Sequence, residues 1–147
     1  MKLIILFLLL ELSFSYNTTA AIYYARRYCK TNYYYYNVYP DGYGNSANFV
    51  SQCLRAGGQD LDGCAGIDNK GSIPFVSNLR ACLTKKGWKS QKGMPKKFKA
   101  GYPFFIENMH ARICTNIEGN TIRYCSHSNN ICDGRVSANS SFYYYYL

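Results

Sequence analysis

Three side chains in this chain of 147 residues have the chemistry of an acyl-transfer site, namely Ser46, His110 and His127. Attack on an acyl carbonyl needs a nucleophile, a base within hydrogen-bond reach and a third group that orients the base. The sequence holds two histidines, and either one taken alone is better explained as a surface imidazole. Together with a hydroxyl at the start of a helix, they indicate a candidate site.

Ser46 lies in the stretch GNSANFVSQCLRAGG and has two interpretations. As the cap of a helix, its oxygen would accept a hydrogen bond from the amide of Asn48 or Phe49, which stabilises a helix by about 1 kcal/mol. As a nucleophile, it would occupy the positive end of the helix dipole, where a thiolate is stabilised. Asn48 is expected to bond to the backbone of the turn.

Three amphipathic segments predict helices, at 19–29, 47–56 and 74–86. The second ends at a double glycine. Its apolar residues recur on one face of a helix: Phe49, Val50, Cys53 and Leu54. Because Cys53 falls about 10 Å along this helix from Ser46, it is expected in the core as a structural cysteine or as half of a disulfide.

The last third of the chain predicts strands. Short β-like runs occupy 102–107, 111–117 and 121–125, and SSFYYYYL is expected to form the last strand. A hairpin turn at 118–120 would pair residue 118 with 121, 114 with 125 and 112 with 127. His110 and His127 then lie near one end of the sheet, as a base and its orienting group require. The order of elements predicts an α+β domain with helices on one face of an antiparallel sheet.

The N-terminal MKLIILFLLLELSFS predicts a secretory signal peptide over residues 1–15, followed by one domain at 16–147. Its apolar run is far shorter than the roughly 20 residues that cross a bilayer. We therefore expect a secreted protein without a stable membrane span. Seven cysteines allow at most three disulfides, and no spacing suits a metal site, so no cofactor is expected. Sequons begin at Asn17 and Asn139.

The formal net charge of +9 is concentrated in one segment. Seven lysines lie between Lys85 and Lys99, in KKGWKSQKGMPKKFK. This segment is either a solvated loop or a surface for an anionic polymer such as cell-wall material or for an acidic membrane surface. The sequence contains no nucleic-acid-binding module, so nucleic acid is not expected as a partner. The tyrosines at 33–36 either offer faces to a sugar or peptide or divide between packing and solvent.

Several motifs resemble one family. NSANFVSQCLRAGG resembles D-C-(T/A)-N-F-V-S-Q-x-L-x-x-G-G of the putative amidase domain, a relative of the NlpC-type and CHAP peptidases. AIYYARRYC resembles the family's A-x-x-Y-A-x-x-Y start, and KKGW its G-W element. GYPFF resembles its G-D-x-x-x-F strand, MHARI its strand-opening catalytic histidine, and CSHSNN its H-T-N-D run. The resemblance covers about residues 20–136.

The resemblance implies a papain-like α+β fold of the NlpC/CHAP type. It also implies a thiolate that attacks amide bonds, often in peptidoglycan-type peptides. By position, it places the nucleophile at Ser46, the base at His110 and the orienting group at His127. It gives Asn129 as a second candidate, and we expect Asn45 and Asn129 to contact substrate. The chain departs from the pattern at four positions, where Asn45, Ser46, Tyr102 and Asn130 replace Asp, Cys, Asp and Asp.

The serine decides between two functions. A hydroxyl does not ionise before attack as a thiol does, so replacing a catalytic Cys by Ser costs about 4 to 6 kcal/mol of transition-state stabilisation. The first hypothesis is an impaired relative that binds peptide or cell-wall fragments without efficient hydrolysis. The alternative is an active amidase or peptidase with Ser46 as nucleophile and His110 as base.

Overall fold

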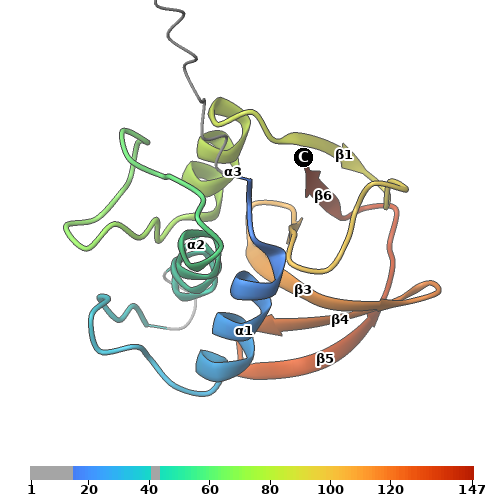
Figure 1. Cartoon of the computed structure of the whole chain (residues 1–147), viewed down its shortest axis with the longest axis horizontal. Helices are drawn as coiled ribbons and strands as arrows, with labels where there is room; N and C mark the ends of the chain where they lie inside the picture. The colour runs from blue at the N-terminus through green and yellow to red at the C-terminus, as the bar shows by residue number, and fades with distance from the viewer. Residues whose placement is uncertain (1–14, 41–43) are drawn as a thin grey trace, which may run out of the picture.

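The computed structural model describes residues 15–40 and 44–147, so the predicted signal peptide lies outside the described residues except for Ser15. Within this part of the chain the helices are α1 Thr18–Tyr28, α2 Asn45–Ala56 and α3 Val76–Lys85 (Figure 1). The strands are β1 Lys89–Lys92, β2 Pro103–Ile106, β3 His110–Glu118, β4 Thr121–Ser126, β5 Ile131–Ser137 and β6 Tyr143–Tyr146. None of the described helices is both long and apolar enough to cross a bilayer.

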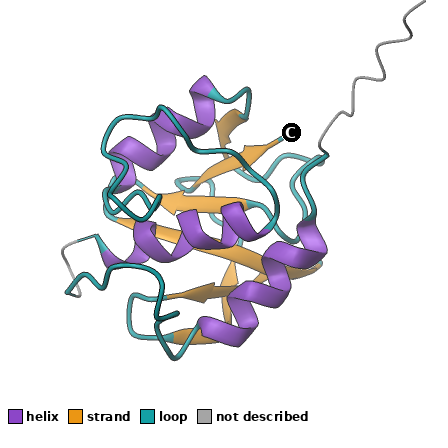
Figure 2. Ribbon diagram, turned by 60° about the vertical axis from the view of Figure 1, so that its left-hand side comes forward, coloured by secondary structure: helices purple, strands orange, loops and turns teal. Residues whose placement is uncertain are grey.

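The strands form one antiparallel sheet in the order β1-β6-β2-β3-β4-β5. Figure 2 shows the three helices together on one side of this sheet. The predicted α+β class and the antiparallel sheet are therefore confirmed. The N-terminal end of α2 lies against the start of the central strand β3, because the Ser46 side chain contacts the Ala111 backbone.

Two strands, β1 and β5, were not predicted from the sequence. β1 lies inside the lysine-rich segment, and all four of its residues are exposed, so no apolar alternation marks it. β5 is only partly buried along its length and lacks the apolar run of a core strand. Both are edge strands. An edge strand is held by backbone pairing with one neighbour, and because few of its side chains are buried, its sequence lacks the apolar pattern of a core strand.

Helix α2 begins two residues earlier than predicted, which removes Ser46 from the capping position. The N-cap is Gly44, with φ of 95°, and no side chain caps the helix. A Cβ at Gly44 would lie 2.3 Å from the Pro74 carbonyl oxygen, so only glycine fits. At the other end, Gly58 has φ of 88°, and the amides of Gly58 and Gln59 bond to carbonyls of the last turn, which closes the helix as predicted.

The hairpin between β3 and β4 pairs as predicted at its turn and shifts by one residue beyond it. Glu118 pairs with Thr121, but Ile113 pairs with Cys125 because β3 contains a bulge between Cys114 and Asn116. The extra residue, Thr115, donates a hydrogen bond of 2.6 Å from its hydroxyl to Asp133 on β5. The predicted pairing of residue 114 with 125 is therefore wrong by one position, since no sequence signal marks the bulge.

Two disulfides join elements across the fold, Cys29–Cys132 and Cys64–Cys82. The other three cysteines are buried thiols, namely Cys53, Cys114 and Cys125. Cys53 has no exposed surface and contributes to the hydrophobic core. It is therefore a structural cysteine and not half of a disulfide, which were the two states predicted for it. Among the tyrosines at 33–36, Tyr34 and Tyr35 are exposed and the other two are half-buried. Of the two predicted arrangements, this is the one in which the rings divide between packing and solvent.

Candidate functional site

Ser46 is the second residue of α2, and its side chain is directed at the start of β3. Its Oγ accepts a hydrogen bond of 3.2 Å from the backbone amide of Ala111. The residue is only 6% exposed. Because Ala111 follows His110 in the chain, this bond fixes the hydroxyl beside the residue predicted as the base. The oxygen is held as an acceptor at a helix N-terminus, where the dipole is positive.

His110 is the first residue of β3 and is half-buried. Its Nδ1 lies 3.3 Å from the hydroxyl of Ser128. Ser128 is itself held by its amide, which donates to the Ser126 hydroxyl at 3.0 Å. Ser128 was not singled out in the sequence, because a regular hairpin would have placed residue 129 opposite His110. The bulge in β3 moves the pairing by one residue and brings Ser128 there instead.

His127 lies on the face of the sheet that the helices cover, and it is 1% exposed. Its ring stacks on Phe49 of α2 with 4.0 Å between centroids and 15° between planes. Its Nε2 lies 2.6 Å from the carbonyl oxygen of Tyr28, so Nε2 carries the proton and donates it to that oxygen. The side chain thus ties β4 to α1 and α2, while Ser128 contacts the His110 ring.

The two asparagines predicted to contact substrate lie in different surroundings. Asn45 is the first residue of α2 and is buried beside Ser46. Asn129 is exposed in the turn between β4 and β5, with φ of 64°. The structure therefore places Asn45 at the helix end and Asn129 on the surface just past Ser128. Asn48 bonds through its Nδ2 to the carbonyl of Asn37 at 3.0 Å, as predicted for a residue that holds the turn.

The turn before His110 is held by Arg80 of α3. The Arg80 Nη1 donates to the Glu107 carbonyl at 3.2 Å and to the Asn108 Oδ1 at 2.7 Å. The guanidinium lies 4.0 Å from the ring centroid of Tyr143, and its Nε donates to the Tyr145 hydroxyl at 3.1 Å. Arg80 thereby fixes a turn in which Glu107 has φ of 52°. Its role was hidden in the sequence, because the contact spans 27 or more residues.

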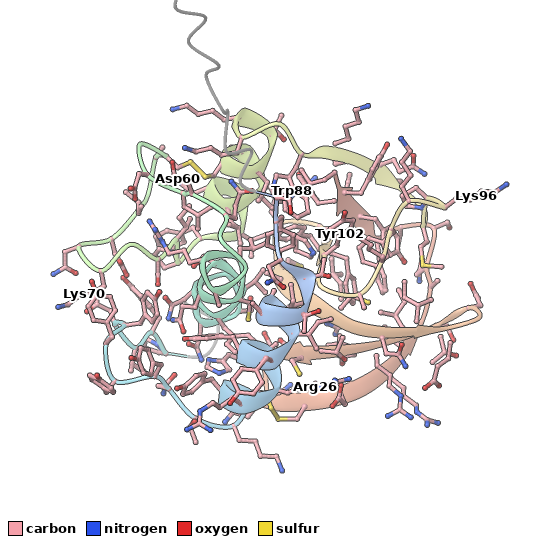
Figure 3. All side chains as sticks on the ribbon, viewed as in Figure 1. Arg26, Asp60, Lys70, Trp88, Lys96 and Tyr102 are labelled. Carbon is pink, nitrogen blue, oxygen red and sulfur yellow. A yellow bond between two sulfur atoms is a disulfide. The ribbon has the colours of Figure 1, made fainter. Side chains whose placement is uncertain are left out.

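Tyr102 stands where the resemblance expects an aspartate, and it is part of the core. Its ring meets Trp88 edge-on at a centroid distance of 5.2 Å. Both residues are labelled in Figure 3. Trp88 in turn donates from its indole to the Gln59 Oε1 at 2.8 Å. Tyr102 therefore acts as a packing residue that joins the segment before β2 to the end of α3.

The free thiols are unsuited to act as nucleophiles in place of Ser46. Burial raises the pKa of Cys114 to about 12 and that of Cys125 to about 11. Burial also raises the pKa of Cys53 well above its ordinary value. A thiol reacts through its thiolate, so these three groups are inert at neutral pH.

Comparison with known proteins gives a match to one family model. The model of the family described as "Putative amidase domain" matches residues 15–99, which include α1, α2, α3 and Ser46. No curated protein and no solved structure matches the chain. Since the match spans more than half of the chain, this protein belongs to the putative amidase domain family.

Proposed function

We propose that this protein binds peptides through an amidase-type site at the start of α2 and hydrolyses them poorly because Ser46 replaces the nucleophilic cysteine. The ligand is an acyl-peptide of the kind found in cell-wall peptides, with an amide carbonyl that reaches the end of the helix. The observation that carries the proposal is the hydrogen bond from the Ala111 amide to Ser46 Oγ.

This bond weakens Ser46 as a nucleophile. An attacking hydroxyl must present a lone pair to the carbonyl while a base removes its proton. In this site one lone pair is already used by a backbone amide, and the residue is buried. A thiolate would need no proton transfer at the moment of attack, so the same surroundings favour Cys over Ser.

The remaining groups suit the recognition of an amide. The first backbone N–H groups of a helix have no partner within the helix, and in α2 the first intrahelical bond is donated by Asn48 to Gly44. The positive end of the helix dipole at the start of α2 suits the oxygen of a bound carbonyl. In this proposal His110 acts as the base and Ser128 sets the orientation of its ring.

The proposal includes a papain-like site and an extracellular location. A helix N-terminus that presents the nucleophile to the start of a sheet strand is the arrangement expected of a papain-like enzyme, and α2 and β3 are consistent with it. Two disulfides are compatible with an oxidising compartment. Both features support the proposal that the mature protein works outside the cell.

The test is to restore the thiol and measure its reactivity. Ser46→Cys should react with iodoacetamide at neutral pH at least tenfold faster than Ser77→Cys, because His110 adds to the helix dipole in one site alone. Ser77 controls for the helix dipole, since it is also the second residue of a helix, α3. Ser77 is exposed and Ser46 is buried, so accessibility alone would favour Ser77→Cys, and a faster reaction of Ser46→Cys is not explained by exposure. The buried thiols contribute little background in the folded protein.

Hydrolysis and binding are measured on the same variants with peptidoglycan fragments and small acyl-peptides. We expect the native protein to bind without measurable turnover and Ser46→Cys to gain turnover that Ser46→Cys/His110→Ala lacks. Turnover by the native protein that disappears in His110→Ala would replace the proposal with the serine amidase. If the two cysteine variants are alkylated at the same rate and no peptide binds, the start of α2 is not the binding site and the proposal is wrong.

A further inference from the structure

Five lysines surround the β1 edge of the sheet and form a surface that we name the lysine edge: Lys89, Lys92, Lys96, Lys97 and Lys99. All five residues are exposed. Lys89 and Lys92 lie on β1, and the others lie in the loop between β1 and β2. Among the described residues, the ion pairs involve other cations, so no carboxylate neutralises this surface.

Charge is segregated along the chain and in space. Residues 69–106 hold nine Lys and Arg and no Asp or Glu. Glu107 follows this stretch in the turn before β3, and the carboxylates that precede it, Asp60, Asp62 and Asp68, lie in the loop between α2 and α3. Figure 3 shows the labelled Asp60 and Lys96 on opposite sides of the molecule. The lysine edge is therefore a positive surface far from that acidic loop.

The two other lysines of the segment have structural partners. Lys86 donates to the Asp62 carbonyl at 2.9 Å and pairs with the Asp60 carboxylate at 3.4 Å. Lys85 donates to the Gly63 carbonyl at 3.2 Å. Both hold the end of α3 to the preceding loop, so they are left out of the lysine edge.

Protection of a sheet edge explains only part of this charge. Lysines on an exposed edge strand prevent pairing with another chain, and Lys89 and Lys92 fit that role. Lys96, Lys97 and Lys99 lie beyond the strand and cannot protect it. Three adjacent exposed cations repel one another, which costs stability unless something else requires them.

We propose that the lysine edge binds an anionic polysaccharide through the sulfate or carboxylate groups along its chain. Repeated anions along a flexible polymer match cations that are spread over a strand and a loop, and no deep pocket is needed. This contact lies on β1 and the loop after it, on other elements than Ser46 of α2. The proposal does not depend on the proposed peptide site.

The rings near the lysine edge argue against single-stranded nucleic acid as the ligand. Such ligands are bound by exposed aromatic faces on which bases stack. Here Trp88, Phe98 and Tyr102 are buried. The ring of Tyr143 is covered by Arg80 and Lys92, whose charged groups lie 4.0 Å and 5.2 Å from its centroid. A polymer that offers charges without bases suits this surface better.

The test compares two triple variants that lose the same charge. Lys96→Gln/Lys97→Gln/Lys99→Gln removes the loop cations, and Lys30→Gln/Lys70→Gln/Arg135→Gln removes three exposed cations elsewhere. Binding to a heparin fragment, to polygalacturonate and to oligodeoxythymidine of matched charge is measured by titration between 50 and 300 mM salt. The two polysaccharides distinguish sulfate from carboxylate as the preferred group.

We expect the loop variant to weaken polysaccharide binding at least tenfold and to reduce the salt slope by about two. The control variant should bind within about twofold of the native protein. Equal weakening by both variants would mean that net charge alone acts, and tighter binding of oligodeoxythymidine would assign the surface to nucleic acid. Polysaccharide binding by the native protein that does not change with salt concentration would also overturn the proposal. If the triple variant fails to fold, the charge reversal Lys97→Glu gives the same comparison against Lys30→Glu.

Discussion

At the scale of single residues, the two histidines separate into different roles. His127 is buried, stacked on Phe49 and bonded to the Tyr28 carbonyl, whereas His110 is half-buried at the strand start beside Ser128. The sequence suggested a pair because both fall at the same end of a hairpin. It could not show that, just past β4, the His127 ring packs on Phe49 of α2 while its neighbour Ser128 contacts the His110 ring.

This difference predicts unequal losses of stability when each histidine is replaced by alanine. His127→Ala should lower the free energy of unfolding by about 3 kcal/mol, since a packed ring and its hydrogen bond are lost. His110→Ala should cost about 1 kcal/mol or less, since one partly exposed bond is lost. Urea unfolding followed by circular dichroism measures both values. A larger loss for His110→Ala than for His127→Ala would contradict these roles.

At the scale of elements, the loop between α2 and α3 holds the tyrosine-rich loop in place through Asp68. Its Oδ2 accepts hydrogen bonds from the Tyr39 hydroxyl at 2.9 Å and from Asn37 at 3.2 Å. Burial disfavours the charged carboxylate, but hydrogen bonds from the amides of Ser72 and Lys70 and from those side chains lower the pKa of Asp68 overall. Asn37 also accepts from Asn48, so Asp68 supports the approach to α2.

Acid should therefore weaken this support. The folded pKa of Asp68 lies below its unfolded value of about 3.9, so its contribution is complete above that value and is lost as the pH falls through the folded pKa. Asp68→Asn should be less stable near neutral pH and lose less stability on acidification to about pH 2. Thermal unfolding across that range measures the difference. If the exposed control Glu107→Gln also loses less stability on acidification, by the same amount, the effect would not belong to Asp68.

The elements that sequence patterns predicted are those that carry a face or a run of apolar residues. Apolar spacing found α1, α2 and α3 within two residues at each end, and the hairpin turn at Gly119 was placed correctly. The start of α2 was misjudged because a glycine with positive φ, Gly44, caps it in place of a hydroxyl. The contacts of Arg80 and Ser128 depend on tertiary structure and on a bulge, which local patterns do not record.

At the scale of the whole molecule, the two disulfides fasten the domain unequally. Cys29–Cys132 joins the end of α1 to β5 across 103 residues, whereas Cys64–Cys82 closes a loop of 18 residues onto α3. A longer closed loop restricts the unfolded chain more strongly. Beside the first disulfide, Arg26 and Asp133 form an ion pair at 3.1 Å that joins the same two elements.

Removal of Cys29–Cys132 should therefore cost more stability than removal of Cys64–Cys82. Cys29→Ala/Cys132→Ala should lower the free energy of unfolding by about 5 kcal/mol, and Cys64→Ala/Cys82→Ala by about 3 kcal/mol. Denaturant unfolding of the oxidised protein and the two variants gives the values. The reverse order would show that the short loop near α3 matters more than chain entropy predicts.

The bulge at Thr115 has a consequence for sequence comparison across homologues. His110 and Ser128 are 18 positions apart, a spacing that depends on one extra residue in β3. An alignment that treats the hairpin as regular would place position 129 opposite His110 and would give Asn129 as the partner of its ring. The family match ends at residue 99, before this hairpin begins. The partner of the histidine in a homologue should therefore be found by locating the bulge first and counting across the strands afterwards.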